Sequence, residues 1–417
     1  MNFGENALLR DICDLACDVQ QQRGKVVYTC EWGTGMETVR MLNLQRQYAS
    51  LRDEIGEAIE SVLQHQHFIL GPEVAALEKE VAEYCKVGHA VGVASGTDAL
   101  LLSLKAAGVG PGDEVIVPAF TFVATSDTVS LLGATPVFAD IDPVTYTMDP
   151  AQLEAIVTPA TKAIIAVHLY GQAADITAIT AFAFKYGLAL LGDTAQALGA
   201  RYDGDPVCSF GDYGCLSFFP SKNLGAYGDG GMIVTRDAEK AQFLRMARAH
   251  GSAKKYRSEF LGWNSRLDEL QAALLRVKLP HLDTWNSQRA ERAARYSAGL
   301  AEIEEIVLPQ AAAGRTHVFH QYTIRVPQRD AVQQLLKEQG IESAVHYPVP
   351  LHRQPMYASL GYEEGSLPEA ERAAREVLSL PIYPELRDDE IDRVVSALKQ
   401  AVRSVRPEAT PVVAELV

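Results

Sequence analysis

The sequence is poor in cysteine, in net positive charge and in long apolar runs. Six cysteines stand in 417 residues, too few for a disulfide framework, and their spacing predicts no metal site. Lys and Arg number 38 against 53 Asp and Glu, a net charge of −15, so a nucleic-acid binder is not expected. No stretch reaches the ~18 apolar residues of a membrane span, and the N-terminus lacks the pattern of a signal peptide. We therefore expect a cytoplasmic protein with reduced thiols, in contact with neither a membrane nor nucleic acid.

What the chain does contain is the composition and rhythm of a folded α/β protein. Hydrophobic residues make up 47% and charged residues 22% of the chain, which is typical of a globular protein with a large core. Short β-rich runs alternate with helical patterns, and several runs are apolar on both faces, as in a parallel sheet covered by helices on each side. The pattern predicts a mostly parallel, seven-stranded sheet, with strands at residues 89–94, 114–118, 135–140, 163–168, 188–193, 214–219 and 231–236.

The chain divides into four parts by its pattern. We expect an N-terminal extension of unknown role over 1–40, where no strand–helix rhythm is visible, and a large domain over 41–280. A smaller C-terminal α+β domain is expected over 281–405, followed by a tail over 406–417. Apolar spacing predicts helices at 51–63, 74–84, 282–300 and 328–339, and a strand at 317–326.

The segment 217–231, SFFPSKNLGAYGDGG, places a lysine in a glycine-rich turn after an apolar strand. Lys222 follows Phe218, Phe219 and Pro220, which predicts a partly desolvated amine. Desolvation lowers the pKa of an amine, and the neutral form can attack a carbonyl, as Schiff-base chemistry requires. The alternative is a structural turn with an incidental lysine.

The segment LGDTAQ places an aspartate at the end of another buried strand. Asp193 is expected at the carboxyl edge of the sheet, where open parallel sheets bind ligands. A carboxylate there could pair with the protonated ring nitrogen of pyridoxal phosphate (PLP), which lets the ring act as an electron sink. Gln196 could reach the ring hydroxyl. The alternative role of Asp193 is to cap a helix.

Two further segments follow predicted strands. In SGTDAL a helix begins, and the backbone amides near Gly96 and Thr97, with the Thr97 hydroxyl, could bind a phosphate group. In PAFTFVAT, Phe122 could stack on a cofactor ring. Each pattern is weak alone, because many α/β proteins cap helices and bury aromatic residues in these ways.

Together these segments resemble the PLP-dependent sugar aminotransferases of the DegT/DnrJ/StrS family, within the fold-type-I aminotransferases. The likeness covers roughly residues 41–403 and rests on SGTDALLLSL, VPAFTFVATSD, DPVTYTMDP, VHLYGQAAD, DTAQALGA, SFFPSKNLGAYGDGG, HGSAKKY, GWNSRLDELQAALLRVKL and AVHYPVPLH. The resemblance implies that Lys222 is the Schiff-base lysine and proton shuttle, and that Asp193 pairs with the ring nitrogen. It gives the remaining cofactor contacts to Gly96, Thr97, Phe122, Gln196 and Ser217.

The resemblance also implies a homodimer with shared active sites, because Asn264 would reach the phosphate of the partner subunit's cofactor. The reaction that the resemblance implies transfers an amino group to a keto-sugar carried on a nucleotide diphosphate. In most of the family the amino donor is L-glutamate. Lysine at 222 favours transamination, since the dehydrating branch has histidine there. Gly192 and Asp229 depart from many members, which have glutamate at both positions.

The substrate contacts follow less directly from the pattern. Arg266 could bind a sugar hydroxyl or carboxylate. Of the polar side chains that could line the sugar pocket, His320 and His346 among them, we select Tyr347 and His352. Amination of C3 is favoured over C4. The alternatives are a PLP enzyme that acts on another ketone or by dehydration, and a non-catalytic PLP-binding regulator, which intact Lys222, Asp193 and Gln196 disfavour.

Overall fold

The computed structural model describes residues 17–22, 25–30 and 38–405. The chain separates into a unit that ends at Thr38 and a unit that begins at Val39. In the first unit, strands β1 (Cys17–Gln22) and β2 (Lys25–Cys30) form an antiparallel hairpin that the sequence pattern did not indicate. Val39 donates its N–H to Gly340 O (2.9 Å) and accepts from Glu342 N (2.9 Å). The domain boundary expected at residue 40 stays a prediction.

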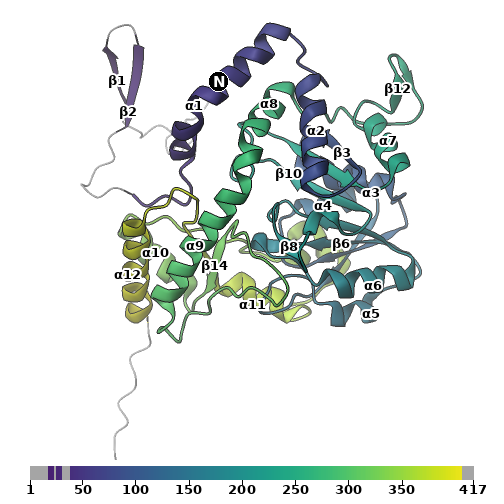
Figure 1. Cartoon of the computed structure of the whole chain (residues 1–417). Helices are drawn as coiled ribbons and strands as arrows, with labels where there is room; N and C mark the ends of the chain where they lie inside the picture. Colours follow the sequence, from purple (N-terminus) through teal and green to yellow (C-terminus); the bar gives the residue numbers. More distant parts are fainter. Residues whose placement is uncertain (1–16, 23–24, 31–37, 406–417) are drawn as a thin grey trace, which may run out of the picture. The chain divides into compact units, whose positions relative to one another are not determined.

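A seven-stranded sheet forms the centre of the second unit (Figure 1), and it confirms the mostly parallel sheet that the sequence predicted. Only β11 runs antiparallel to its two neighbours, β10 and β3. The other pairings are parallel. In spatial order the strands are β3 (His89–Val93), β11 (Gly231–Thr235), β10 (Tyr213–Ser217), β7 (Ala189–Asp193), β6 (Thr161–Val167), β4 (Glu114–Pro118) and β5 (Thr135–Ala139).

Both faces of this sheet are buried, which explains why its strands read as continuous apolar runs. In β4, Val115 and Val117 join one apolar cluster, whereas Ile116 joins another, because successive strand residues point to opposite faces. The flanking helices are α2 (Pro72–Tyr84), α3 (Gly96–Ala106), α4 (Ala124–Leu131), α5 (Leu153–Ile156), α6 (Ile176–Tyr186), α7 (Ala238–Ala247) and α8 (Glu269–Lys278). Short strands β8 (Arg201–Tyr202), β9 (Asp205–Pro206), β12 (Ser252–Lys254) and β13 (Arg257–Ser258) lie in connecting loops.

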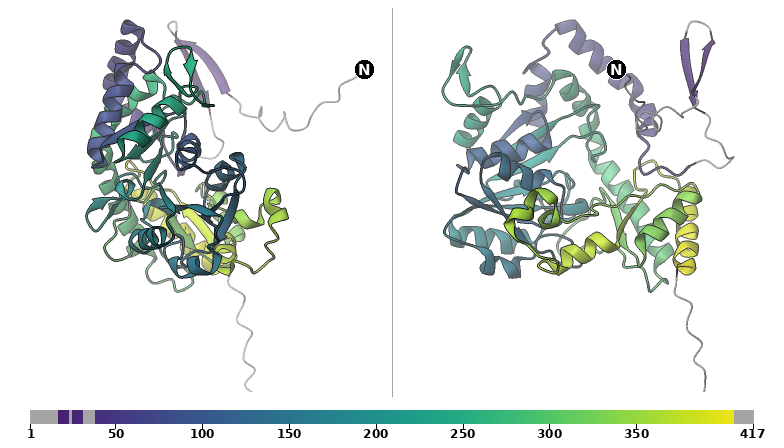
Figure 2. Two further views of the ribbon diagram at one scale, coloured as in Figure 1. Left: turned by 90° about the vertical axis from the view of Figure 1, so that its right-hand side faces the viewer. Right: turned by 180° about the vertical axis from the view of Figure 1, so that it is seen from behind.

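Most of the C-terminal elements gather beside one another (Figure 2, right) and share one apolar cluster, which includes Tyr296, Tyr322, Leu336 and Leu398. The helix at 368–376 instead packs against the cluster of the central sheet. The predicted helix at 282–300 is confirmed. The elements are α9 (Leu282–Leu300), β14 (Tyr322–Arg325), α10 (Arg329–Glu338), α11 (Pro368–Glu376), β15 (Val377–Leu380) and α12 (Asp388–Ser404). These helices and the β14–β15 pair agree with the expected α+β character, while the domain boundary at 280 stays a prediction.

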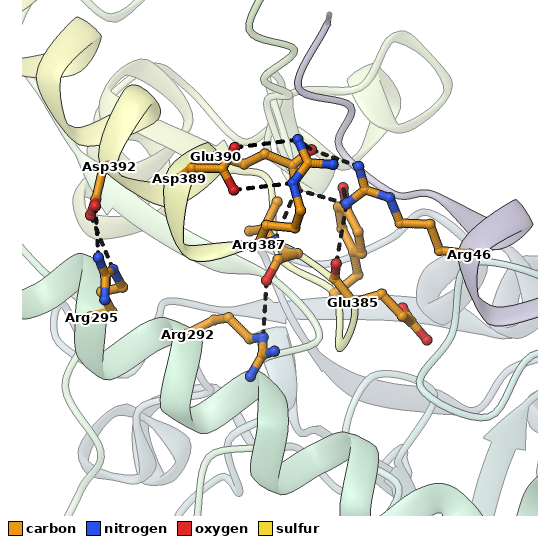
Figure 3. Close-up of polar contacts among 10 residues, drawn as sticks. Arg46, Arg292, Arg295, Glu385, Arg387, Asp389, Glu390 and Asp392 are labelled. Carbon is orange, nitrogen blue, oxygen red and sulfur yellow. Dashed lines mark hydrogen bonds and ion pairs between the residues drawn. The ribbon is translucent and has the colours of Figure 1, made fainter. Parts of the chain in front are cut away.

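Helix α1 (Leu44–His65) is joined to the C-terminal elements by a charged network (Figure 3). Arg46 donates to both carboxylate oxygens of Glu390 at 2.7 Å and to the carbonyl of Glu385 at 3.1 Å. Arg295 of α9 pairs with Asp392 of α12 at 2.6 Å. Within the part of the chain that the structure describes, none of the helices has both the length and the apolar character that a bilayer span requires.

Candidate active site

A cavity of about 400 Å³ lies where β3, β4, β7 and β10 end. Because parallel strands end at one edge of a sheet, segments far apart in the sequence meet there. The cavity brings together eight of the side chains and backbone positions that the sequence selected: Gly96, Thr97, Phe122, Asp193, Gln196, Ser217, Lys222 and Tyr347.

Lys222 lies in the tight turn that follows β10. Its N–H donates to Phe219 O (2.8 Å), and Ala226 N donates to Phe218 O (2.8 Å), so the turn closes on itself. Burial lowers the pKa of Lys222 to about 8, and the attraction of Asp193 partly opposes this shift. With a pKa of about 8, roughly a tenth of the amine is neutral at pH 7. The neutral form is the nucleophile that Schiff-base formation needs.

Glycine is required in this turn because the backbone passes close to other groups. A Cβ on Gly225 would come within 2.3 Å of Pro220 O. A Cβ on Gly231 would come within 2.2 Å of Ser95 O. Real Cβ atoms essentially never show such distances, so a larger residue would displace the Lys222 turn at Gly225 and the segment before α3 at Gly231.

Asp193 is the last residue of β7, and its carboxylate is buried. Thr125 Oγ1 donates to one oxygen (3.3 Å), and Ala195 N donates to the other (3.1 Å). Burial raises the pKa of Asp193, while the Ala195 N–H, the charge of Lys222 and the Thr125 hydroxyl act in the opposite direction. A turn, not a helix, follows Asp193, so the alternative role as a helix cap is wrong.

Gln196 is held by two hydrogen bonds that set the orientation of its amide. Its Oε1 accepts from Tyr170 N (2.8 Å), and its Nε2 donates to the Tyr347 hydroxyl (3.0 Å). The ring of Phe122 lies 6.1 Å from that of Tyr347 at an angle of 44° and is 53% exposed. The cavity therefore has an aromatic wall beside a fixed amide.

The first turn of α3 forms another part of the cavity wall. Ser95 caps this helix by accepting from Asp98 N (3.0 Å). Gly96 and Thr97 follow at the first two helical positions, where backbone N–H groups have no acceptor within the helix. A Cβ on Gly96 would come within 2.6 Å of Ser217 Cβ. The close approach of these two segments and the helix dipole create an environment suited to an anion.

Three selected residues lie outside this cavity. Asn264 and Arg266 line a neighbouring cavity of about 310 Å³, and Asp229 lines both. His352 is buried instead, with its Nε2 3.1 Å from Glu371 Oε1. The selection of His352 as a substrate contact is therefore corrected, because its side chain belongs to the interior below α11.

Two histidines that were considered for the sugar pocket but not selected, His320 and His346, do line the cavity. Burial lowers the pKa of His346 to about 4, and the charge of Lys222 acts in the same direction. His346 directly precedes the selected Tyr347 in the sequence, and this adjacency was a reason to select it as well. His320 was assigned to a strand, whereas β14 begins only at Tyr322.

The model of the DegT/DnrJ/EryC1/StrS aminotransferase family matches residues 49–399. A protein of Geobacillus stearothermophilus named pleiotropic regulatory protein is 54% identical over 88% of this chain and 99% of its own length. A UDP-N-acetyl-3-dehydro-α-D-glucosamine 3-aminotransferase of Acidithiobacillus ferrooxidans is 51% identical over 87% and 98%. The crystal structure of DesV from Streptomyces venezuelae, in complex with a ketimine intermediate, superposes with a TM-score of 0.87 at 46% identity, over 89% of this chain and all of DesV.

These matches span nearly the whole described chain and agree with the seven-stranded fold and its cavity. This chain belongs to the DegT/DnrJ/EryC1/StrS aminotransferase family.

Proposed function

We propose that the protein transfers an amino group to the keto group of a sugar carried on a nucleotide diphosphate, with PLP as its cofactor. The observation that carries this proposal is the cavity that Lys222 and the buried Asp193 both line, in a chain of this aminotransferase family. The Acidithiobacillus relative, at 51% identity, supports the sugar nucleotide and amination at C3.

The residues of the cavity fit PLP. At one end, the first-turn amides of α3 and the Ser217 hydroxyl suit a phosphate group. At the other end, the buried Asp193 carboxylate suits a protonated pyridine nitrogen, a pairing that offsets the cost of burying either charge alone. Phe122 offers an aromatic face for the ring. PLP supplies the electron sink that makes the substrate carbon acidic.

In this proposal Lys222 moves the proton at the reacting carbon, acting as base when neutral and as acid when charged. A pKa of about 8 leaves both forms populated near neutral pH. Asp193 keeps the ring nitrogen protonated, and Gln196, oriented by Tyr170 N and Tyr347, binds the ring hydroxyl. Tyr347 borders the space that the sugar would occupy.

The donor we propose is L-glutamate, and we place the reaction in the cytoplasm; both follow from the family resemblance. We further propose a homodimer in which Asn264 of the partner subunit reaches the cofactor phosphate and Arg266 binds the sugar. The separate cavity that these two residues line supports this arrangement, because in one chain they do not reach Lys222's cavity.

The absorbance spectrum of the purified protein loaded with PLP, recorded before and after L-glutamate, tests the proposal. We expect the band of the lysine-bound cofactor to be lost and a band of the aminated cofactor to appear. Neither change should occur in Lys222→Ala. UDP- and dTDP-linked 3-keto and 4-keto sugars, added afterwards, should restore the first band to different extents and so identify the acceptor.

Two other outcomes would select the alternatives. Restoration by a ketone without a nucleotide would indicate a different acceptor class. A cofactor band that does not change when glutamate or any other amino donor is added would favour a non-catalytic PLP-binding regulator. The name of the Geobacillus relative also suggests this alternative. No band at all after addition of PLP would contradict the cofactor.

A further inference from the structure

Asn223, the residue after the predicted Schiff-base lysine, does not line the cavity, and its side chain joins a network of buried amides. Asn223 is 5% exposed. Its Nδ2 donates to Asn286 Oδ1 of α9 (2.7 Å) and to Val318 O (3.1 Å). Its Oδ1 lies 3.2 Å from Nδ1 of His320. Asn223 therefore connects the Lys222 turn to a helix, a loop and a histidine of the same cavity.

The orientation of each amide in this network is fixed by backbone carbonyls. Asn286 Nδ2 donates to Leu198 O (3.1 Å), so its other amide atom, Oδ1, must accept from Asn223. Val318 O is a carbonyl and can only accept. Both N–H bonds of Asn223 are thus used, and the atom that it turns toward His320 is an oxygen, which cannot donate. His320 must therefore carry its proton on Nδ1.

The surroundings of His320 favour the neutral ring. Burial lowers the pKa of His320 well below its usual value, and its basic neighbours Lys222, Arg289 and His346 act in the same direction. Its hydrogen-bond partner is an amide, which brings no negative charge to stabilise an imidazolium. A neutral ring protonated on Nδ1 has a lone pair on Nε2.

We propose that Asn223 and Asn286 are positioning residues that lock His320 in the Nδ1–H tautomer, so that its Nε2 offers a hydrogen-bond acceptor to the cavity of Lys222. The inference rests on the function proposed above, in which Lys222 alternates between amine and ammonium. An acceptor in the wall can take a hydrogen bond from the ammonium or from a substrate hydroxyl, and it adds no second positive charge. The other tautomer is also neutral but would present a donor at Nε2, which could accept neither of these hydrogen bonds.

Nuclear magnetic resonance of the PLP-loaded protein labelled with ¹⁵N-histidine tests the tautomer directly. Two-bond correlations between ring nitrogens and ring protons distinguish Nδ1–H from Nε2–H, and the His320→Gln spectrum identifies the His320 signals among the ten histidines. We expect a protonated Nδ1 and an unprotonated Nε2, unchanged from about pH 6 to about pH 9. An Nε2–H tautomer, or a ring that titrates in this range, would overturn the proposal.

A matched pair of substitutions tests the role of Nε2. The amide of His320→Asn can occupy the position of Nδ1 and keep the contact with Asn223, but it leaves nothing at Nε2. The amide of His320→Gln reaches the position of Nε2 and can present its oxygen there. We expect the single-turnover rate with L-glutamate to fall about tenfold in His320→Asn, the cost of one hydrogen bond, and to recover largely in His320→Gln.

Equal rates in the two variants, or a faster His320→Asn, would contradict the role of Nε2. Melting temperatures of the two proteins separate this effect from a loss of folding. If the wild-type protein itself does not react with any amino donor, the proposed function fails, whereas the tautomer experiment still decides whether the amide network locks His320.

Discussion

At the scale of single residues, the protein contains a second buried lysine that the proposed reaction does not use. Lys278 Nζ donates to Gly225 O (2.7 Å) and lies 3.8 Å from the centre of the Tyr227 ring. Both contacts are made to the turn that carries Lys222. Burial lowers the pKa of Lys278 to about 8. Because an unfolded lysine titrates near 10.4, the folded protein binds fewer protons between these two values.

This difference predicts how the stability contribution of Lys278 depends on pH. Where the unfolded state binds more protons, the free energy of unfolding rises with pH. The contribution of Lys278 should therefore grow from about pH 8 to about pH 10.5. We expect the free energy of unfolding of the wild type, minus that of Lys278→Met, to increase over this range when urea titrations are repeated at each pH. A difference that stays constant would mean that Lys278 is not desolvated.

Asp193 allows a second prediction at this scale. Asp193→Asn keeps the shape of the side chain and its contact with Ala195 N but removes the charge. We expect the single-turnover rate with L-glutamate to fall by about 10²–10³-fold, as when one preorganised electrostatic contact is lost. The pKa of Lys222 should also fall below about 8, since the charge of Asp193 raises it. The pH dependence of acylation of Lys222 in the PLP-free protein measures this shift.

Thr125→Val is the control for Asp193→Asn, because it makes a smaller change at the same carboxylate. It removes one hydrogen bond to the carboxylate but leaves the charge in place, so a loss near tenfold is expected. If Thr125→Val were as damaging as Asp193→Asn, packing and not charge would explain both results.

At the scale of elements, helix α2 depends on a carboxylate from another helix. Glu269 of α8 is fully buried, and its carboxylate accepts from Gly71 N (2.9 Å), Glu73 N (2.6 Å) and Val74 N (3.3 Å). These are the N–H groups at the start of α2, which have no acceptor within the helix. A negative charge there is also favoured by the helix dipole.

Glu269→Gln on α8 should therefore destabilise the protein more than the same change at an exposed glutamate of α2. The amide keeps one oxygen but places a donor against backbone N–H groups, and we expect a loss of about 1–3 kcal/mol in the free energy of unfolding. The matched control is Glu83→Gln on α2, whose exposed carboxylate lies 3.9 Å from Lys79 Nζ and should cost at most about 0.5 kcal/mol. Urea titrations of both variants that gave equal losses would contradict the role of Glu269 as a cap.

The sequence predicted elements well wherever local pattern alone decides the structure. All seven sheet strands and the helix at 282–300 lie close to where their apolar spacing placed them, because neighbouring elements bury both faces of the strands and one side of the helix. The strand expected at 317–326 is shorter because Val318 N donates to Gly171 O and Gln321 N to Tyr170 O. These partners are distant in sequence, so no local pattern could indicate them. His352 was misplaced for a similar reason, since its partner Glu371 belongs to another element.

At the scale of the whole molecule, two cavities lie next to each other and share Asp229. One holds Lys222 and Asp193, and the other holds Asn264 and Arg266. The family resemblance implied that Asn264 serves the partner subunit's site, but no local pattern in the sequence could show that Asn264 and Arg266 line a cavity of their own. The proposed homodimer resolves the separation if each site combines Lys222 of one protomer with Asn264 of the partner subunit.

Mixed dimers test this arrangement. Lys222→Ala and Asn264→Ala homodimers should each be nearly inactive, since every site lacks one group. In a mixed dimer one site lacks both groups and the other is intact. Random exchange should make about half of the dimers mixed, and each mixed dimer has one of its two equivalent sites intact. About a quarter of the wild-type activity should therefore return. Doubly tagged heterodimers, purified and assayed with L-glutamate and the accepted keto-sugar, measure this directly. Inactive heterodimers would mean that each chain completes its own site, and a fully active Asn264→Ala homodimer would remove Asn264 from the site altogether.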